Sequence, residues 1–198
     1  MNLIIFDINK EFIQEAKRLE KYGIKVVEMD VNNLINSYQI DTLVSPANSF
    51  GYMNGGIDKV YSDIFSGIQQ TVQNKIKEVG VMSNMGKYAI PVGSAITVQT
   101  NYSKCPYLIS APTMYLPGNI RGTNNVFFCF IAVLYLLKNG NGKSVACPGL
   151  GTSIGGLSPK DAVDQMENAI KLYDDMMKNG QYLSNIKYYD KFNLVMKN

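Results

Sequence analysis

The 198-residue sequence contains no histidine. This absence excludes histidine general bases, histidine-containing catalytic triads and nearly all zinc sites. Any catalysis must therefore use carboxylates, amides, hydroxyls, backbone groups or the substrate itself. We expect the protein to need neither a metal nor another cofactor.

Cysteine is scarce as well. The chain has three cysteines, Cys105, Cys129 and Cys147, and they are widely spaced. Cys129 and Cys147 lie in apolar runs, so we expect them to be buried thiols. An odd number without a pairing pattern indicates a reducing compartment, and we therefore expect a cytoplasmic protein.

The sequence also lacks a dense basic block and a long apolar run. Its net charge of +3 is a weak bias toward an anionic partner and no specific signal for nucleic acid. The longest apolar run, residues 126–137, is about 12 residues long, too short to span a bilayer, and predicts a buried helix. The apolar N-terminus is too short for a signal peptide, and Asp7 interrupts it. No membrane partner is expected, and nothing in the sequence indicates the oligomeric state.

The bulk composition is typical of one globular domain. Hydrophobic residues make up 46% of the chain and charged residues 18%. A chain of this length buries a sizeable core without disulfides or metals. We find no internal repeat or low-complexity linker, so residues 1–198 are interpreted as a single domain. The aromatic and basic segment 182–198 is left without an assigned structure.

Strands and helices are predicted to alternate along the chain. Short apolar runs predict strands at residues 3–6, 24–29, 42–44, 94–99, 107–111 and 145–147. Apolar spacing and capping residues predict helices at residues 10–21, 57–79, 124–138 and 159–179. This alternation predicts a central sheet with helices on both faces. In such sheets, ligands bind beyond the carboxyl ends of the strands.

One glycine-rich loop follows the last predicted strand. Residues 148–156 read Pro-Gly-Leu-Gly-Thr-Ser-Ile-Gly-Gly and precede a helix that Ser158 can cap. Glycines let successive backbone N–H groups point into one concavity, a nest that holds an anion. Thr152 and Ser153 add hydroxyl donors, so a diphosphate fits without a lysine. On composition alone, a plain glycine-rich connection explains the segment equally well.

A second loop, residues 45–58, follows the third predicted strand. Asn48 offers a donor and an acceptor at the strand end, which suits a sugar hydroxyl. Gly55 and Gly56 permit close approach of the backbone to a ligand. Asp58 falls in the first turn of the next helix, where a favourable interaction with the helix dipole would by itself explain it.

Two further features have simple explanations. Asp30 ends the second predicted strand and can cap the next short helix. Residues 140–144, Gly-Asn-Gly-Lys-Ser, resemble the end of a phosphate-binding P-loop. That motif requires a glycine at position 137, which is Leu137, and a helix rather than a strand after it, so this segment is interpreted as a turn.

At these residues the chain resembles the macro domain family. The family's first loop typically reads Asn-Ala-Ala-Asn-Ser, a glycine run and then Gly-Gly-Val-Asp, and residues 45–49 and 55–58 match it in order and spacing. Residues 151–156 are similar to the family's phosphate loop, and the pair at 30–31 matches its early Asp-Ile pair. The resemblance covers about residues 24–178. It implies a three-layer α/β/α fold with a mixed, mostly parallel central sheet.

The resemblance also implies which residues form a site. It places Asp30 at the adenine amino group, Asn48 at the distal ribose, and residues 149–155 around the diphosphate. In hydrolytic members, the residues that match Asn48 and Asp58 position the scissile bond and the water, so these two are the catalytic candidates. The ligand-binding set implied in this way is Asp30, Val31, Asn48, Asn54, Gly55, Gly56, Ile57, Gly149, Leu150, Gly151, Thr152, Ser153, Ile154 and Gly155.

The function implied is binding of ADP-ribose or a related NAD-derived nucleotide, with metal-independent hydrolysis that removes ADP-ribose from a modified target. Residues 44–58 and 111–114 are similar to a divergent branch that reads Ser-Pro-Ala-Asn-Ser-Phe-Gly and Ala-Pro-Thr-Met. That branch is expected to carry an acidic residue where this chain has Asn54. A non-catalytic module that binds or senses ADP-ribose or another NAD derivative is therefore the alternative. A structural protein that keeps the fold without its ligand is a third.

Overall fold

The computed structural model describes residues 2–139 and 143–179, so the segment 182–198 lies outside the described residues. Its main feature is a six-stranded sheet with the order β2-β1-β8-β3-β7-β6. The strands are β1 (Leu3–Asp7), β2 (Lys25–Glu28), β3 (Thr42–Ser45), β6 (Ile96–Gln99), β7 (Tyr107–Ser110) and β8 (Val145–Pro148). All neighbours are parallel except β6, which is antiparallel to β7. The prediction of a mixed, mostly parallel sheet is confirmed.

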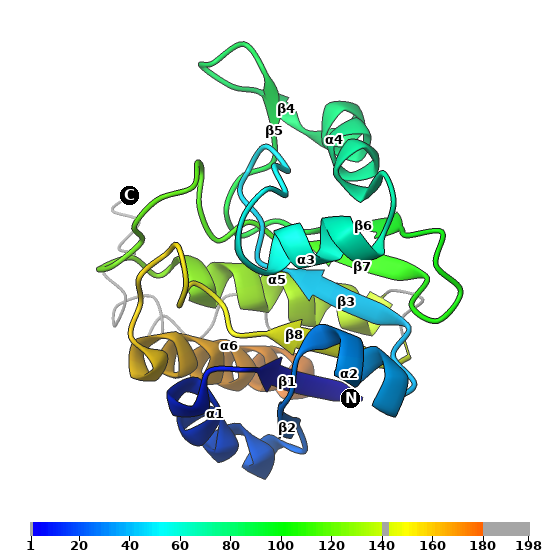
Figure 1. Cartoon of the computed structure of the whole chain (residues 1–198). Helices are drawn as coiled ribbons and strands as arrows, with labels where there is room; N and C mark the ends of the chain where they lie inside the picture. The colour runs from blue at the N-terminus through cyan, green and yellow to red at the C-terminus, as the bar shows by residue number, and fades with distance from the viewer. Residues whose placement is uncertain (1, 140–142, 180–198) are drawn as a thin grey trace, which may run out of the picture.

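Helices cover both faces of this sheet. Figure 1 shows α2 and α3 in front of the sheet and α5 and α6 behind it. The helices are α1 (Lys10–Ala16), α2 (Val31–Ser37), α3 (Gly56–Ile64), α4 (Ile68–Val79), α5 (Asn125–Asn139) and α6 (Pro159–Asn179), with a 3-10 turn η1 (Lys17–Tyr22) after α1. The three-layer α/β/α architecture is therefore also confirmed.

The alternation of side chains along β1 explains the two cores. Leu3 and Ile5 pack with residues of α1, α5 and α6, whereas Ile4 and Phe6 pack with residues of α2, α3 and α4. Successive side chains of a strand point to opposite faces, so a strand that is apolar at every position has to be covered on both sides. The apolar run of β1 thus requires a helical layer on each face.

The structure corrects one predicted helix and adds a hairpin. The helix predicted at residues 57–79 is two helices, because the chain turns at residues 65–67, where Gly67 has a φ of 73° in the left-handed region. Apolar residues continue at helical spacing beyond the turn, so periodicity alone does not reveal the break. The unpredicted hairpin joins β4 (Val81–Met82) and β5 (Tyr88–Ala89), and three of its four strand residues are exposed.

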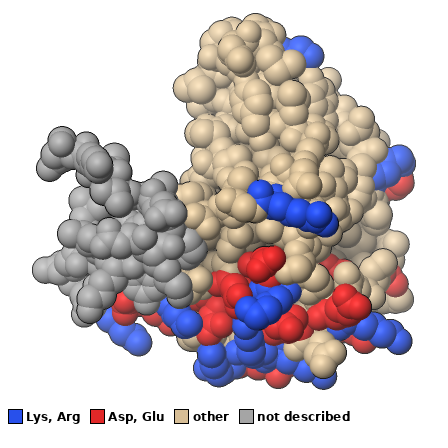
Figure 2. Space-filling view, turned by 90° about the vertical axis from the view of Figure 1, so that its left-hand side faces the viewer, with Lys and Arg blue, Asp and Glu red and all other residues tan. Residues whose placement is uncertain are grey.

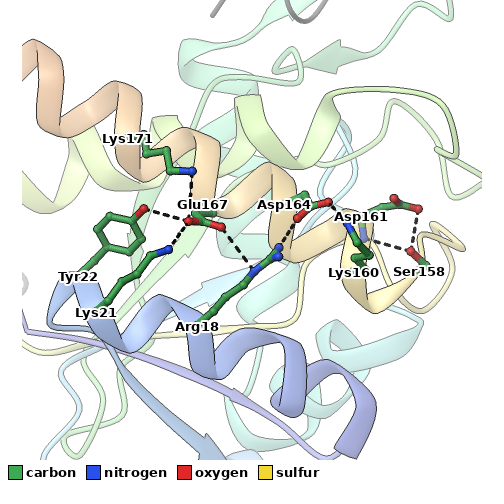
Figure 3. A network of polar contacts seen from close by, with 9 residues as sticks. All are labelled: Arg18, Lys21, Tyr22, Ser158, Lys160, Asp161, Asp164, Glu167 and Lys171. Atoms are coloured by element: carbon green, nitrogen blue, oxygen red, sulfur yellow. Dashed lines mark hydrogen bonds and ion pairs between the residues drawn. The ribbon is translucent and has the colours of Figure 1, made fainter.

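A network of charged side chains fastens η1 to α6 (Figure 3). The carboxylate of Glu167 receives Lys21 Nζ at 2.7 Å, Lys171 Nζ at 3.2 Å and the Tyr22 hydroxyl at 3.0 Å. Arg18 Nε lies 3.5 Å from the same group. Figure 2 shows one face of the molecule, on which the charged side chains gather in the lower part of the view. The upper part of the same view carries few of them.

The apolar run at residues 126–137 forms most of α5, which packs into the core. Val126, Cys129, Phe130 and Val133 are completely buried there. Among the described residues, no helix combines the length and apolarity that crossing a bilayer requires.

Candidate functional site

A cleft of about 600 Å³ lies where the parallel strands end. Its walls come from the segments that follow β1, β2, β3, β7 and β8, all at the carboxyl end of the sheet. Open α/β sheets bind ligands at this edge. Most of the residues predicted for the site line this cleft: Asp30, Val31, Asn48, Asn54, Gly55, Gly56, Ile57, Gly149, Gly151, Thr152, Ser153, Ile154 and Gly155.

Two predicted residues do not line the cleft. Leu150 is completely buried and packs in the core with α1, α5 and α6. Asp58 is also buried, and its Oδ1 accepts a 2.6 Å hydrogen bond from the Ser45 hydroxyl at the end of β3. Burial raises the pKa of the Asp58 carboxyl to about 6, against a partial lowering by the Ser45 hydrogen bond. The carboxyl group therefore lies behind the cleft wall.

Asn48 organises the first loop. Its Oδ1 accepts hydrogen bonds from the backbone N–H groups of Phe50 at 3.1 Å and Tyr52 at 3.2 Å, and its Nδ2 donates to the Tyr52 carbonyl at 2.7 Å. The backbone of Asn48 also bridges to Met114 beside it. Its amide therefore shapes the loop and retains one N–H for a ligand.

The N-terminus of α3 meets the second loop across the cleft. Gly55 is the N-cap of α3 and forms no side-chain capping bond, so the first-turn N–H groups stay available. A Cβ at Gly55 would lie 3.2 Å from Ile154 Cδ1, and one at Gly56 would lie 4.0 Å from Ser153 Oγ. A helix N-terminus favours anions. The two glycine-rich loops thus place donors on opposite sides of the same space.

The second loop is held by bonds at its ends. Leu157 N–H donates to the Gly151 carbonyl at 3.0 Å, and Gly156 N–H donates to the Ser153 carbonyl at 3.0 Å. Within the part of the chain that the structure describes, the N–H groups of residues 152–155 have no hydrogen-bond acceptor. A run of unpaired N–H groups in a glycine-rich loop is a nest for an anion.

The other end of the cleft carries acidic side chains. Asp7 Oδ1 accepts from Asn9 N–H at 2.9 Å, and Asp7 Oδ2 accepts from Gly149 N–H at 3.2 Å. Asp30 Oδ1 accepts from Asn33 N–H at 2.9 Å, so Asp30 caps α2 and also lines the cleft. Among the cleft residues that the structure describes, these two aspartates carry the only charges. An anion in this cleft would be bound by N–H groups rather than by lysine or arginine.

Sequence reasoning missed several cleft residues. They include Asp7, Asn9, Thr113, Met114 and Pro117. Asp7 ends β1, and the last three follow β7, so the rule that ligands bind beyond the carboxyl ends of strands could have found them. The described residues contain no group of three or more His, Cys, Asp or Glu side chains that could hold a metal ion.

The fold and this cleft define the chain as an α/β/α protein with a ligand site where two glycine-rich loops meet at the carboxyl edge of its sheet. The family model described as Macro domain matches residues 44–166. The chain therefore belongs to the macro domain family. The residues before position 44, which include Asp7 and Asp30, lie outside the matched region.

Known proteins and structures agree with this assignment. An uncharacterised protein of Aquifex aeolicus (strain VF5) is 32% identical over 144 residues, which cover 73% of this chain and 81% of the relative. The macrodomain of Mycobacterium tuberculosis DarG has a similar fold, with a TM-score of 0.56 at 21% identity over 70% of this chain and 86% of that one. Thermosipho africanus DarTG, solved in complex with ADP-ribose, gives a TM-score of 0.56 at 17% identity over 91% of this chain and 55% of that one.

Proposed function

We propose that the protein binds ADP-ribose in the cleft between the two loops. The observation that carries this proposal is the run of unpaired N–H groups at residues 152–155, opposite the uncapped N-terminus of α3. Together they form a site for a diphosphate that needs no basic side chain. The complex of Thermosipho africanus DarTG with ADP-ribose supports this choice of ligand.

The rest of the ligand fits the remaining walls. The diphosphate lies against the N–H groups of residues 152–155, and the adenosine extends toward Asp30 and Val31, where a carboxylate can accept from the adenine amino group. The distal ribose lies at Asn48 and residues 54–57. The partner is then free ADP-ribose or the ADP-ribose group of a modified target.

Isothermal titration calorimetry with ADP-ribose, AMP and ribose 5-phosphate tests the proposal. ADP-ribose is expected to bind with a Kd below about 100 μM, roughly −5.5 kcal/mol, and at least about tenfold more tightly than either fragment. The fragments bind more weakly because each leaves part of the diphosphate nest or one ribose site empty. Absence of binding by ADP-ribose would overturn the proposal.

Hydrolysis of the bond to the distal ribose is a second candidate function. The observation in its favour is Asp58, which lies in the first turn of α3 next to Gly56 and Ile57 and has a pKa raised by burial to about 6. A carboxyl group in this range suits general acid–base catalysis near neutral pH. The hydrogen bond to Ser45 weighs against it, because the carboxyl group has to leave this partner to reach a water in the cleft.

Turnover of a mono-ADP-ribosylated protein by the wild type and by Asp58→Asn separates the two functions. Hydrolysis that uses Asp58 predicts at least a tenfold loss in the variant, while its Kd for ADP-ribose changes less than about threefold. Equal turnover by the two proteins removes Asp58 from the mechanism. Tight binding without any turnover by the wild type leaves binding alone as the function.

A further inference from the structure

We propose that Asp7 and Asp30 make the adenosine end of the cleft selective for nucleotides with a free ribose 2′-hydroxyl, and that they exclude 2′-phosphorylated nucleotides. This inference rests on the proposed function and specifies its ligand class: derivatives of NAD bind, and derivatives of its 2′-phosphorylated form do not.

The two aspartates lie on neighbouring strand ends. Asp7 is the last residue of β1 and pairs in register with Glu28 of β2. Met29 N–H, one residue before Asp30, donates to the Asp7 carbonyl at 3.0 Å. Both aspartates line the same cleft. A ligand group that reaches this end of the cleft therefore meets both carboxylates.

Each carboxylate accepts two hydrogen bonds within the protein and keeps further acceptor sites for a ligand; Asp30 accepts both of its bonds from Asn33, from the backbone N–H on Oδ1 and from Nδ2 on Oδ2. The Asp7 oxygens each receive one backbone N–H, from Asn9 and from Gly149, and these bonds fix the carboxylate beside the start of the second loop. A carboxylate has about four lone-pair sites in total, so sites remain for donors of a ligand. Ribose hydroxyls and an adenine amino group are such donors.

Among the residues that the structure describes, no lysine or arginine lines this end of the cleft. Lys10 is the nearby cation, but it is 84% exposed, lies outside the cleft and approaches Glu28 at 4.0 Å. Glu28 itself lines a hollow beside Asp30, so the Lys10–Glu28 pair adds no net positive charge to this side. A 2′-phosphate carries about −1.5 to −2 charges at neutral pH and would be repelled by carboxylates that hydroxyls can approach.

The contrast with the other end of the cleft supports this assignment. Residues 152–155 offer N–H donors without acceptors, and the α3 N-terminus faces them. The cleft thus attracts negative charge at the diphosphate position and repels it at the adenosine position. A ligand with an additional phosphate at the ribose 2′ position would be attracted at the diphosphate position and repelled at the adenosine position.

Calorimetry on the full chain with ADP-ribose and ADP-ribose 2′-phosphate tests the inference. The wild type is expected to bind the 2′-phosphorylated ligand at least about tenfold more weakly at low salt, and the ratio of the two Kd values should shrink at high salt because charges are screened. Asp7→Asn is expected to reduce the ratio at least about threefold. Glu11→Gln removes an exposed acid from α1 outside the cleft and should leave the ratio unchanged.

The ratio of the two Kd values separates selectivity from general damage to the second loop, because a disturbed loop weakens the binding of both ligands equally. Similar Kd values for the two ligands on the wild type would overturn the inference while the proposed function stands. If Asp7→Asn does not fold, the wild-type ratio and its salt dependence decide the matter alone. Absence of binding by ADP-ribose itself would overturn the proposed function, and the inference with it.

Discussion

The Ser45 hydroxyl donates a 2.6 Å hydrogen bond to Oδ1 of Asp58, which turns this carboxyl group toward β3 and away from the cleft. The bond joins the last residue of β3 to the first turn of α3 and closes the first loop at its base. Burial still dominates the electrostatics of the pair, since the pKa of Asp58 lies near 6 despite a partner that favours the ionised form. Asp58 therefore has a structural role whatever its role in chemistry.

Asp58→Asn is expected to flatten the dependence of stability on pH. The folded-state pKa of Asp58 is about 6 and its ordinary value is 3.8, so the folded protein holds this proton more tightly than the unfolded chain. The contribution of Asp58 protonation to the free energy of unfolding is complete below about pH 4 and is lost as the pH rises through about 6. This contribution amounts to roughly 3 kcal/mol in total. Asparagine cannot ionise, so the variant should gain stability relative to the wild type as the pH rises.

Urea denaturation between about pH 4 and pH 7.5 measures this effect. The matched control is Asp63→Asn on the same helix, where the carboxylate is 62% exposed and pairs with Lys59. The control should follow the wild-type curve. Parallel curves for Asp58→Asn and the wild type would contradict the prediction.

Glu167→Gln is expected to loosen the contact between η1 and α6. Burial opposes ionisation of Glu167, but the hydrogen bonds from Lys21, Lys171 and Tyr22 outweigh it and lower its pKa to about 2, from 4.5. Its contribution is therefore complete above about pH 4.5 and is lost as the pH falls through about 2. We expect a loss of about 1–3 kcal/mol at pH 7 that diminishes in acid.

Thermal or urea unfolding at pH 7 and pH 3.5 checks this difference. Glu78→Gln is the control, because Glu78 is 66% exposed and pairs with its helix neighbour Lys75. An exposed pair of this kind contributes less than about 0.5 kcal/mol. A Glu167→Gln variant as stable as this control at pH 7 would show that the network adds nothing.

Much of the fold could be predicted from the sequence because each strand of the six-stranded sheet and most helices have a strong local signal. Buried apolar runs mark the strands, and Ser158 with Pro159 marks the start of α6, where Ser158 Oγ accepts from Asp161 N–H at 3.0 Å. The break before α4 has no such signal, because the apolar spacing of α3 and α4 is continuous. The hairpin of β4 and β5 is too short and too exposed to produce an alternating pattern.

The candidate site was only partly accessible to sequence reasoning. The glycine loops have a local pattern, and the ligand-binding residues predicted in them line the cleft, except Leu150. Asp7 could not be linked to Gly149 from the sequence, because that contact joins residues 142 positions apart through the pairing of β1 with β8. The direction of the Asp58 side chain likewise depends on tertiary packing, which spacing along the chain does not contain.

The three cysteines are expected to be unreactive in the folded protein. Burial, with a contribution from nearby Asp41, raises the pKa of Cys105 to about 12, and burial raises the pKa of Cys129 and Cys147 further above the ordinary range. A thiol reagent attacks the thiolate, which these sites disfavour. Reaction with DTNB at pH 7.5 should be at least about 100-fold slower in buffer than in 8 M urea, because the folded protein disfavours the thiolate and shields the sulfur atoms from the reagent. Met82→Cys, at a position 58% exposed, supplies a rapidly reacting thiol for comparison, and similarly fast reaction of the wild type would contradict the prediction.

Gly155→Ala is expected to disrupt the diphosphate nest. A Cβ at position 155 would lie 2.5 Å from the Gly151 carbonyl oxygen and 2.9 Å from Ile120 Cγ1, so the loop backbone has to shift. The shift moves the N–H groups of residues 152–155, and we expect ADP-ribose to bind at least about tenfold more weakly, with a stability loss of about 1–3 kcal/mol. Gly118→Ala is the matched control, because the Cβ there meets no atom closer than 3.8 Å. Calorimetry at a temperature where circular dichroism shows both variants folded separates lost binding from lost structure, and a Gly155→Ala variant that binds ADP-ribose as tightly as Gly118→Ala would place the diphosphate outside this loop.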